Sequence, residues 1–393
     1  MFADLAPPPP DPILGIAQIF SADPATDKVD LGIGIYKDES GEAPILASVK
    51  AAEAWLIETQ KSKRYLSSAG NPDYNRLTRA LLFGEGSDIF ERARTIQTPG
   101  GTGALRVAAD FLKKLRPEGA RVFIPDPTWA NHNLLFTTAG HQVVVYPYYD
   151  VASGTLRFDE MMAALAGIGP GDIVLLHGCC HNPAGADPDP AQWAAIADLL
   201  ERTGATPLVD LAYLGFGEGL EADAASTRLL ASRLPEIIVA SSYSKNFALY
   251  RDRAGALSLI AKTPAEADRA HAHLLPVVRA NYSMPPDHGA AVVAHILGDT
   301  VLRAQWEAEV AAMRARIHSM RACLSDQLAG SNARDYDFIA RQRGMFAMLG
   351  LAQDVVERMR GEHRVYVGTG GRINIAGLTE RNVAHVAAAI SAI

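Results

Sequence analysis

Residues 236–247 have the sequence EIIVASSYSKNF. The first half of this stretch is a short apolar run of the kind that forms a buried strand. Ser242, Ser244 and Lys245 follow at the end of the run, and Arg253 lies a short way further along. A lysine beside hydroxyls and a second cation can have a lowered pKa and act as a nucleophile. On this stretch alone, a solvated lysine after a strand is an equally good explanation.

Two upstream apolar runs also end in polar side chains. The run that begins at residue 207 ends with Asp210 and Tyr213, and Asn182 follows the run at residues 172–177. Ligands of open parallel sheets bind beyond the carboxyl ends of the strands, so we expect these groups to meet there. For Asp210 and Tyr213, a helix N-cap and a packed ring remain the simpler alternative.

Together these groups point to one cofactor. An amine, a carboxylate, a phenol, an amide and a guanidinium are the groups needed to hold pyridoxal phosphate (PLP). The lysine would form a Schiff base with the cofactor aldehyde, and the carboxylate would keep the pyridine nitrogen protonated.

Apolar segments and helical patterns alternate through the middle of the chain. Strands are expected at residues 120–125, 142–146, 172–177, 207–210 and 237–240, with 254–260 pairing back, and helices at 104–115 and 191–203. This alternation predicts an α/β fold with a mostly parallel central sheet covered on both faces.

The pattern also predicts two lobes and an arm. A long amphipathic helix over residues 302–328 is expected to lead into a C-terminal lobe. The predicted division is an N-terminal arm at 1–12, a small domain at 13–46 and 312–393, and a large domain at 47–311. The proline run at 7–10 favours an extended arm, which either lies on a partner subunit or is a frayed terminus.

The composition narrows the class of protein. The chain has 393 residues, 48% of them hydrophobic, and a formal net charge of -7. Nothing in this balance indicates a nucleic-acid or membrane partner. Three cysteines do not make a disulfide framework, and neither a signal peptide nor a membrane span is predicted, so we expect a cytoplasmic enzyme.

Residues 177–183, with the sequence HGCCHNP, contain the adjacent cysteines Cys179 and Cys180. This spacing is not the C-x2-C of a zinc site, and no second half-site exists in the sequence. We therefore predict no metal.

Residues 98–106, with the sequence TPGGTGALR, form a glycine-rich turn that opens a helix. Free amides at a helix N-terminus favour an anion, and a phosphate is the best match. A tight turn without a ligand explains the motif as well. A dinucleotide site is disfavoured because Arg106 replaces the third glycine of that motif.

Four further residues could contact a planar ring or a carboxylate. Trp129 could cover one face of a ring, and His132 could orient Asp210. Arg279 and Arg372 could each bind a carboxylate in a bidentate manner. For each residue alone, simple packing or a surface charge is the more common explanation.

Taken together, these segments resemble the class I aspartate/aromatic amino acid aminotransferase family, which is PLP-dependent and of fold type I, over essentially the whole chain. The resemblance implies that Lys245, Asp210 and Tyr213 are catalytic. The implied cofactor-binding residues are Gly101, Thr102, Trp129, Asn182, Asp210, Tyr213, Ser242, Lys245, Arg253 and Tyr65 of the partner subunit. The implied substrate-binding residues are Gly34, Trp129, Asn182, Arg372 and Arg279 of the partner subunit.

The resemblance also implies a reaction and a homodimer with shared active sites. The expected function is transfer of an amino group from aspartate, aromatic amino acids or both to 2-oxoglutarate, in ping-pong order. Met284 and Ile35 are apolar, and Met284 replaces the asparagine usual in aspartate-specific members. These residues favour a pocket that also accepts aromatic side chains. The alternatives are a strictly dicarboxylate-specific aspartate aminotransferase, a NAD-type dehydrogenase and a non-catalytic regulator on the same fold.

Overall fold

The computed structural model describes residues 2, 4–7, 14–330 and 334–392. Most of the predicted arm at 1–12 therefore lies outside the described residues. The first described helix is α1 (Leu14–Ala22). Within the described residues, no helix combines the length and the apolar character that a membrane crossing requires.

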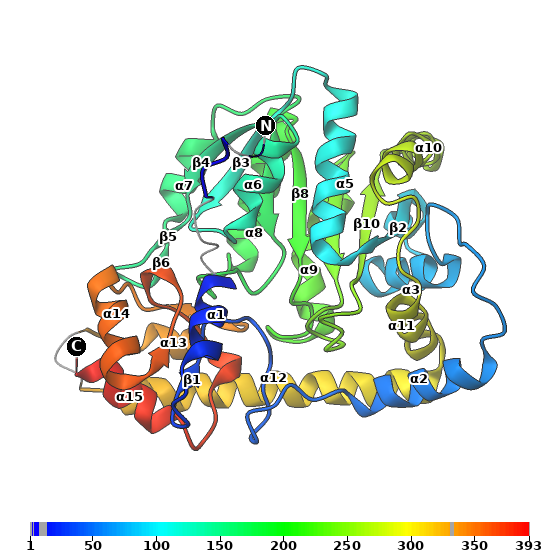
Figure 1. The fold of residues 1–393 in the computed structure, drawn as a ribbon. Helices are drawn as coiled ribbons and strands as arrows, with labels where there is room; N and C mark the ends of the chain where they lie inside the picture. The colour runs from blue at the N-terminus through cyan, green and yellow to red at the C-terminus, as the bar shows by residue number, and fades with distance from the viewer. Residues whose placement is uncertain (1, 3, 8–13, 331–333, 393) are drawn as a thin grey trace.

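The centre of the molecule is a seven-stranded sheet with the order β2-β10-β9-β8-β7-β3-β4 (Figure 1). The strands are β2 (Ala93–Pro99), β3 (Arg121–Asp126), β4 (Gln142–Pro147), β7 (Ile173–His177), β8 (Thr206–Leu211), β9 (Ile237–Ser242) and β10 (Ala254–Ile260). Neighbours from β9 to β4 pair in parallel, and β10 runs antiparallel to both β9 and β2. The α/β fold class is confirmed, and so is the expected return strand at 254–260.

Helices cover both faces of the sheet, and its central strands β7, β8 and β9 are therefore buried along almost their whole length. The helices of this part are α2 (Ala47–Thr59), α3 (Pro72–Phe83), α4 (Asp88–Arg92), α5 (Gly100–Leu115), α6 (Asn131–Thr138), α7 (Phe158–Leu165), α8 (Pro190–Thr203), α9 (Leu220–Arg233), α10 (Pro264–Asn281) and α11 (His288–Gly298). Side chains of α5, α6 and α10 share one buried cluster with the sheet, and those of α7, α8 and α9 belong to the other.

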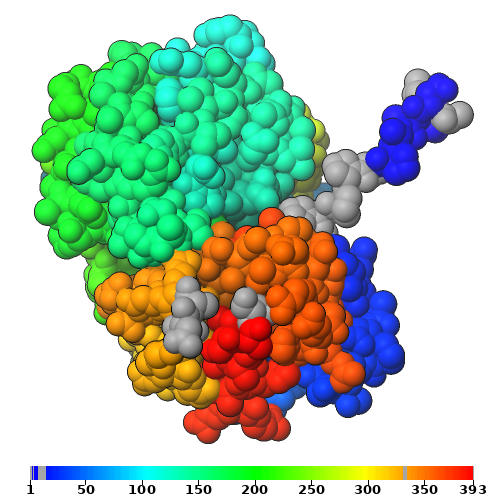
Figure 2. Space-filling model, turned by 90° about the vertical axis from the view of Figure 1, so that its left-hand side faces the viewer, coloured from blue at the N-terminus to red at the C-terminus, as the bar shows by residue number. Residues whose placement is uncertain are grey.

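A long helix, α12 (Thr300–Leu328), runs from beneath the sheet into a second group of elements (Figure 1). This group contains β1 (Val29–Asp30), α13 (Phe338–Arg341), β11 (Phe346–Met348), α14 (Gln353–His363), β12 (Val365–Tyr366), β13 (Arg372–Asn374) and α15 (Val383–Ser391). Figure 2 shows the C-terminal elements of this group, in orange and red, below the part that holds the sheet. The predicted boundary at 311/312 falls inside α12, and the domain boundaries stay a prediction.

Two short two-stranded pairings shape the second group. β1 pairs in parallel with β12, and β11 pairs antiparallel with β13. The pairing of β1 with β12 brings a segment from near the N-terminus beside the C-terminal part of the chain. The loop after β1, which contains Gly34, is thereby set next to Arg372 of β13.

Candidate active site

A cavity of about 250 Å³ opens at the carboxyl ends of the parallel strands. It is lined by Gly101, Thr102, Leu105, Trp129, Asn182, Asp210, Ala212, Tyr213, Ser242, Ser244, Lys245 and Arg253. All of the predicted cofactor-binding residues line it except Tyr65. The expectation that the strand ends converge is therefore correct.

Lys245 follows β9 and lies inside this cavity. Its Nζ atom is 5.2 Å from the centre of the Tyr213 ring. Its pKa is lowered to about 8, because burial disfavours the charged ammonium and Arg253 repels it, while Asp210 partly opposes both effects. A much larger fraction of Lys245 than of an ordinary lysine is therefore an uncharged amine near neutral pH, able to attack a carbonyl.

This pKa gives a testable prediction. In competitive labelling of the cofactor-free protein with acetic anhydride, the rate for Lys245 should rise with pH and level off above about pH 8. The exposed Lys262, read from the same digest, is the reference lysine outside the cavity. Peptide mass spectrometry measures both. Two superimposable curves would show that the pocket does not perturb Lys245.

Asp210 at the end of β8 carries a buried carboxylate. Burial acts to raise its pKa, but the hydrogen bond and charge of His132, together with His177 and Lys245, lower it overall. His132 Nε2 lies 3.1 Å from Asp210 Oδ2. Asp210 is therefore held as an anion that faces the cavity, and the expectation that His132 orients it is supported by this contact.

A second layer supports His132. Thr128 Oγ1 lies 2.8 Å from His132 Nδ1 and 3.1 Å from His177 Nε2. The pKa of His177 is lowered to about 3 by burial and by His132, so His177 is neutral. His177 of β7 is paired in register with Asp210 of β8. The parallel pairing of the two strands thus places His177 behind the carboxylate.

The opposite end of the cavity is built for an anion. α5 begins at Gly100, and its first amides and its dipole face Ser242 and Arg253. Arg253 Nη1 donates to Ser244 Oγ (3.3 Å) and to the carbonyl of Tyr250 (2.9 Å). Gly100 has a φ of +71°, and a Cβ there would lie 2.4 Å from Arg253 Nη2. Any residue other than glycine at position 100 would therefore clash with the guanidinium of Arg253.

Asn182 and Tyr213 form the side of the cavity. Asn182 Nδ2 donates to Tyr213 Oη at 3.2 Å. Burial raises the pKa of Tyr213, so its phenol stays protonated. Asn182 Oδ1 is buried and has no hydrogen-bond partner within the described residues. A hydrogen-bond donor of a bound molecule or an ordered water would satisfy this oxygen.

Arg372 and Gly34 belong to the second group of elements and do not line the cavity themselves, but both lie against Phe346, which packs on the cavity residue Tyr213. Arg372 donates to the carbonyl of Gly32, and its guanidinium lies 4.9 Å from the centre of the Phe346 ring. Phe346 in turn packs edge-on against Tyr213, with ring centres 5.9 Å apart. A Cβ at Gly34 would lie 2.6 Å from Phe346 Cζ, so a larger residue there would push this ring.

Tyr65 and Arg279 are not brought into the cavity of their own chain. Tyr65 is 94% exposed and lines a separate hollow of about 1050 Å³ between α2, α3 and α11. Arg279 is exposed at the end of α10, where it donates to Ser283 Oγ at 3.0 Å. Their assignment to a neighbouring active site stays a prediction.

Comparison with known proteins agrees with this geometry. Residues 26–390 match the family described as "Aminotransferase class I and II". The chain is 49% identical over 396 residues to aspartate aminotransferase of Escherichia coli (strain K12), with 100% of each chain covered. It is 44% identical to aromatic-amino-acid aminotransferase of Paracoccus denitrificans, with 99% of each covered.

The chain belongs to this aminotransferase family. A solved structure of aromatic-amino-acid aminotransferase from Burkholderia pseudomallei, covalently bound to pyridoxal phosphate, matches with a TM-score of 0.96 and 44% identity. That match covers 100% of this chain and 99% of the other. The predicted family, fold type and enzyme class are confirmed, and the dehydrogenase and regulator alternatives are set aside.

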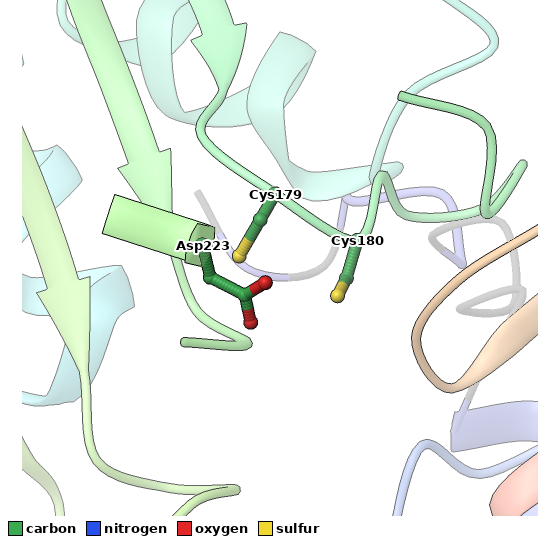
Figure 3. Close-up of side chains that lie close together, drawn as sticks. All are labelled: Cys179, Cys180 and Asp223. Carbon is green, nitrogen blue, oxygen red and sulfur yellow. The ribbon is translucent and has the colours of Figure 1, made fainter. Parts of the chain in front are cut away.

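Cys179, Cys180 and Asp223, none of which lines the cavity of the aminotransferase, lie close together (Figure 3). Their Sγ and carboxylate oxygen atoms are all within 4.8 Å of one another. Asp223 already accepts backbone N–H groups from Gly215, Gly217 and Glu218, at 2.8–2.9 Å. A hydrogen bond with Cys180 and burial raise the pKa of the Cys179 thiol. Asp223 thus stabilises the turn at residues 215–218, and the two thiols are buried beside it. The absence of a metal stays a prediction.

Several residues around the aminotransferase cavity were not among the predicted site residues. Leu105, Ala212 and Ser244 line it, and Thr128 and His177 support His132. For His177 a signal existed in the sequence, because it ends the strand run at 172–177 just as Asp210 ends the next. Thr128 carried no comparable signal, since it lies in a loop.

Proposed function

We propose that this aminotransferase uses pyridoxal phosphate to move an amino group from aspartate and from aromatic amino acids to 2-oxoglutarate, in ping-pong order. The observation that carries the proposal is the meeting of Lys245, Asp210 and Arg253 on one cavity. The amine, the carboxylate and the guanidinium come from separate segments, and each matches a different part of the same cofactor.

The residues present fit the cofactor. Asp210 is an anion suited to a pyridinium nitrogen, and the start of α5 with Arg253 suits a phosphate. The cofactor, when bound, supplies an electron sink for the α-carbon of the amino acid. Its remaining contacts would come from Gly101, Thr102, Trp129, Asn182, Tyr213, Ser242 and Tyr65 of the partner subunit.

The protein groups then do the proton and positioning work. Lys245, whose pKa is lowered, would hold the cofactor in the resting enzyme and would carry a proton at the substrate α-carbon. Asp210, held by His132, would keep the ring nitrogen protonated. Tyr213 and Asn182 would donate to the ring oxygen, and Trp129 would cover a ring face. These groups are fixed before substrate binds, which lowers the reorganisation that the reaction needs.

The substrate side is set by two arginines. Arg372, beside Gly34, binds the α-carboxylate, with Asn182 and Trp129 nearby. Arg279 of the partner subunit binds a distal carboxylate. The apolar, flexible side chain of Met284 allows the pocket to accept an aromatic substrate side chain instead of one that ends in a carboxylate. A strictly dicarboxylate-specific enzyme is the alternative for this step.

A homodimer would complete the site. Tyr65 and Arg279 are exposed and lie outside their own cavity. Phe2 and Leu5 are 83% and 70% exposed, and Trp55 and Tyr65 line the large hollow between α2, α3 and α11. Exposed aromatic side chains around a hollow are typical of a subunit contact.

We place the enzyme in the cytoplasm, because its cysteines are free thiols and its proposed substrates are small molecules.

The role of Arg279 is tested with Arg279→Leu and with Arg269→Leu as the matched control, since Arg269 is an exposed arginine on the same helix. We expect kcat/KM for aspartate to fall about 100-fold in Arg279→Leu, the usual effect of unpairing a bound carboxylate. The value for phenylalanine should change little, and Arg269→Leu should match the wild type with both donors.

Steady-state rates with 2-oxoglutarate as acceptor measure these effects. An equal loss with aspartate and phenylalanine would show that Arg279 does not bind the distal carboxylate. A wild-type enzyme that ignores aromatic donors would establish the dicarboxylate-specific alternative. Absence of transamination with every amino acid would remove the proposed function itself.

A further inference from the structure

The loop after β1, residues 31–37, is bonded to the second group of elements. Asn374 Nδ2 donates to the carbonyls of Ile33 and Ile35, each at 2.7 Å. Asn374 N also donates to the carbonyl of Leu31 at 2.8 Å, and Arg372 donates to the carbonyl of Gly32. The loop that contains Gly34 is thus fastened to the same strand that supplies Arg372.

The same loop is also bonded to the part of the molecule that holds the sheet. Tyr36 N donates to Tyr250 Oη at 2.9 Å, across 214 positions of the chain. Tyr250 lies in the turn between Lys245 and Arg253, and its carbonyl accepts from Arg253 Nη1 at 2.9 Å. One residue therefore contacts the anion-binding arginine through its backbone and the substrate-side loop through its phenol.

The Tyr250–Tyr36 bond is suited to hold position rather than to exchange protons. Burial raises the pKa of Tyr250 to about 12, so the phenol stays neutral in the working range. Tyr36 itself is 7% exposed. Loss of the hydroxyl would leave its N–H buried without its acceptor, and an unpaired buried donor is costly.

We propose that Tyr250 is a positioning residue that sets the loop at 31–37, and with it Gly34 and Arg372, against the cavity before the amino acid binds. This inference rests on the proposed function, which assigns Gly34 and Arg372 to substrate binding. The hydrogen bond between Tyr36 and Tyr250 does not depend on that assignment and can be tested in protein without cofactor. In this arrangement, the turn that fixes Arg253 also fixes the place of the substrate carboxylate.

The test compares Tyr250→Phe with Tyr146→Phe. Tyr146 is a matched control because its buried hydroxyl also makes a single bond to the backbone, donating to the carbonyl of Leu175 at 2.8 Å within the sheet. Hydrogen exchange of residues 31–37 is measured in cofactor-free protein. The dissociation constant of succinate, a dicarboxylate that cannot react, is measured in the holoenzyme.

In Tyr250→Phe we expect faster exchange at 31–37 and a dissociation constant for succinate that is about 5- to 30-fold higher. Exchange at 173–177 and retention of the cofactor should be unchanged, and Tyr146→Phe should alter neither residues 31–37 nor succinate binding. In the unmodified protein, the amide of Tyr36 should already be protected, a measurement that needs no variant.

Two results would overturn the proposal. One is an unprotected Tyr36 amide in the wild type. The other is a Tyr250→Phe protein whose loop exchange and succinate affinity equal those of Tyr146→Phe, since a merely structural role would lower thermal stability without these specific changes. If the enzyme failed to transaminate any donor, the proposed function would fail, while exchange at 31–37 would still decide whether Tyr250 holds the loop.

Discussion

Replacement of Lys245 by alanine should lower transamination by about 10⁴-fold or more, the largest effect of any single change in this chain. The amine is the one group in the cavity that can both bond an aldehyde and carry a proton. Alanine removes both roles, and no other lysine lines the cavity within the described residues. The visible absorbance of a covalently bound cofactor should vanish with the activity.

Lys262→Ala is the matched control, because Lys262 is exposed and follows the neighbouring strand β10. It should keep the wild-type rate and spectrum. Rates with aspartate and 2-oxoglutarate, together with an absorbance scan, measure both variants. Normal turnover in Lys245→Ala would end the proposed mechanism.

Replacement of Asp210 by asparagine should lower kcat by about 10³-fold. The amide has the same shape but no charge, so it cannot keep a ring nitrogen protonated. Glutamate at this position should recover part of the rate, because it restores the anion. His132 lies 3.1 Å from the carboxylate, so its loss should have a smaller effect of the same kind.

Asp223→Asn serves as the control for removal of a buried carboxylate. Asp223 accepts backbone N–H groups outside the cavity, so its loss should lower thermal stability and leave kcat near the wild-type value. Kinetics and thermal unfolding separate the two effects. A wild-type kcat in Asp210→Asn would show that the charge has no part in the reaction.

The sheet could be predicted because its strands are short, apolar and regularly spaced. β7, β8 and β9 begin and end within two residues of the expected positions. The helix expected at 104–115 is longer at its start, since α5 begins at Gly100. The glycines there discouraged a helix by their propensity, and contact with Arg253 and β10 outweighs that preference.

The cofactor side of the site was predictable for a related reason. Asp210 and Lys245 follow strand runs directly, and parallel pairing brings such ends together. The Thr128–His132–His177 contacts depend on a loop conformation, which local sequence does not determine. The bond between Tyr36 and Tyr250 joins residues 214 positions apart, and no periodic pattern marks either of them.

The most direct test of the central claim is chemical. The purified holoenzyme is reduced with sodium borohydride, digested, and searched for the pyridoxyl label by mass spectrometry. We predict one label per chain, on Lys245, and loss of that label in Lys245→Ala. A label on another lysine, with the Lys245 peptide unmodified, would contradict the claim that the amine, the carboxylate and the guanidinium surround a single cofactor.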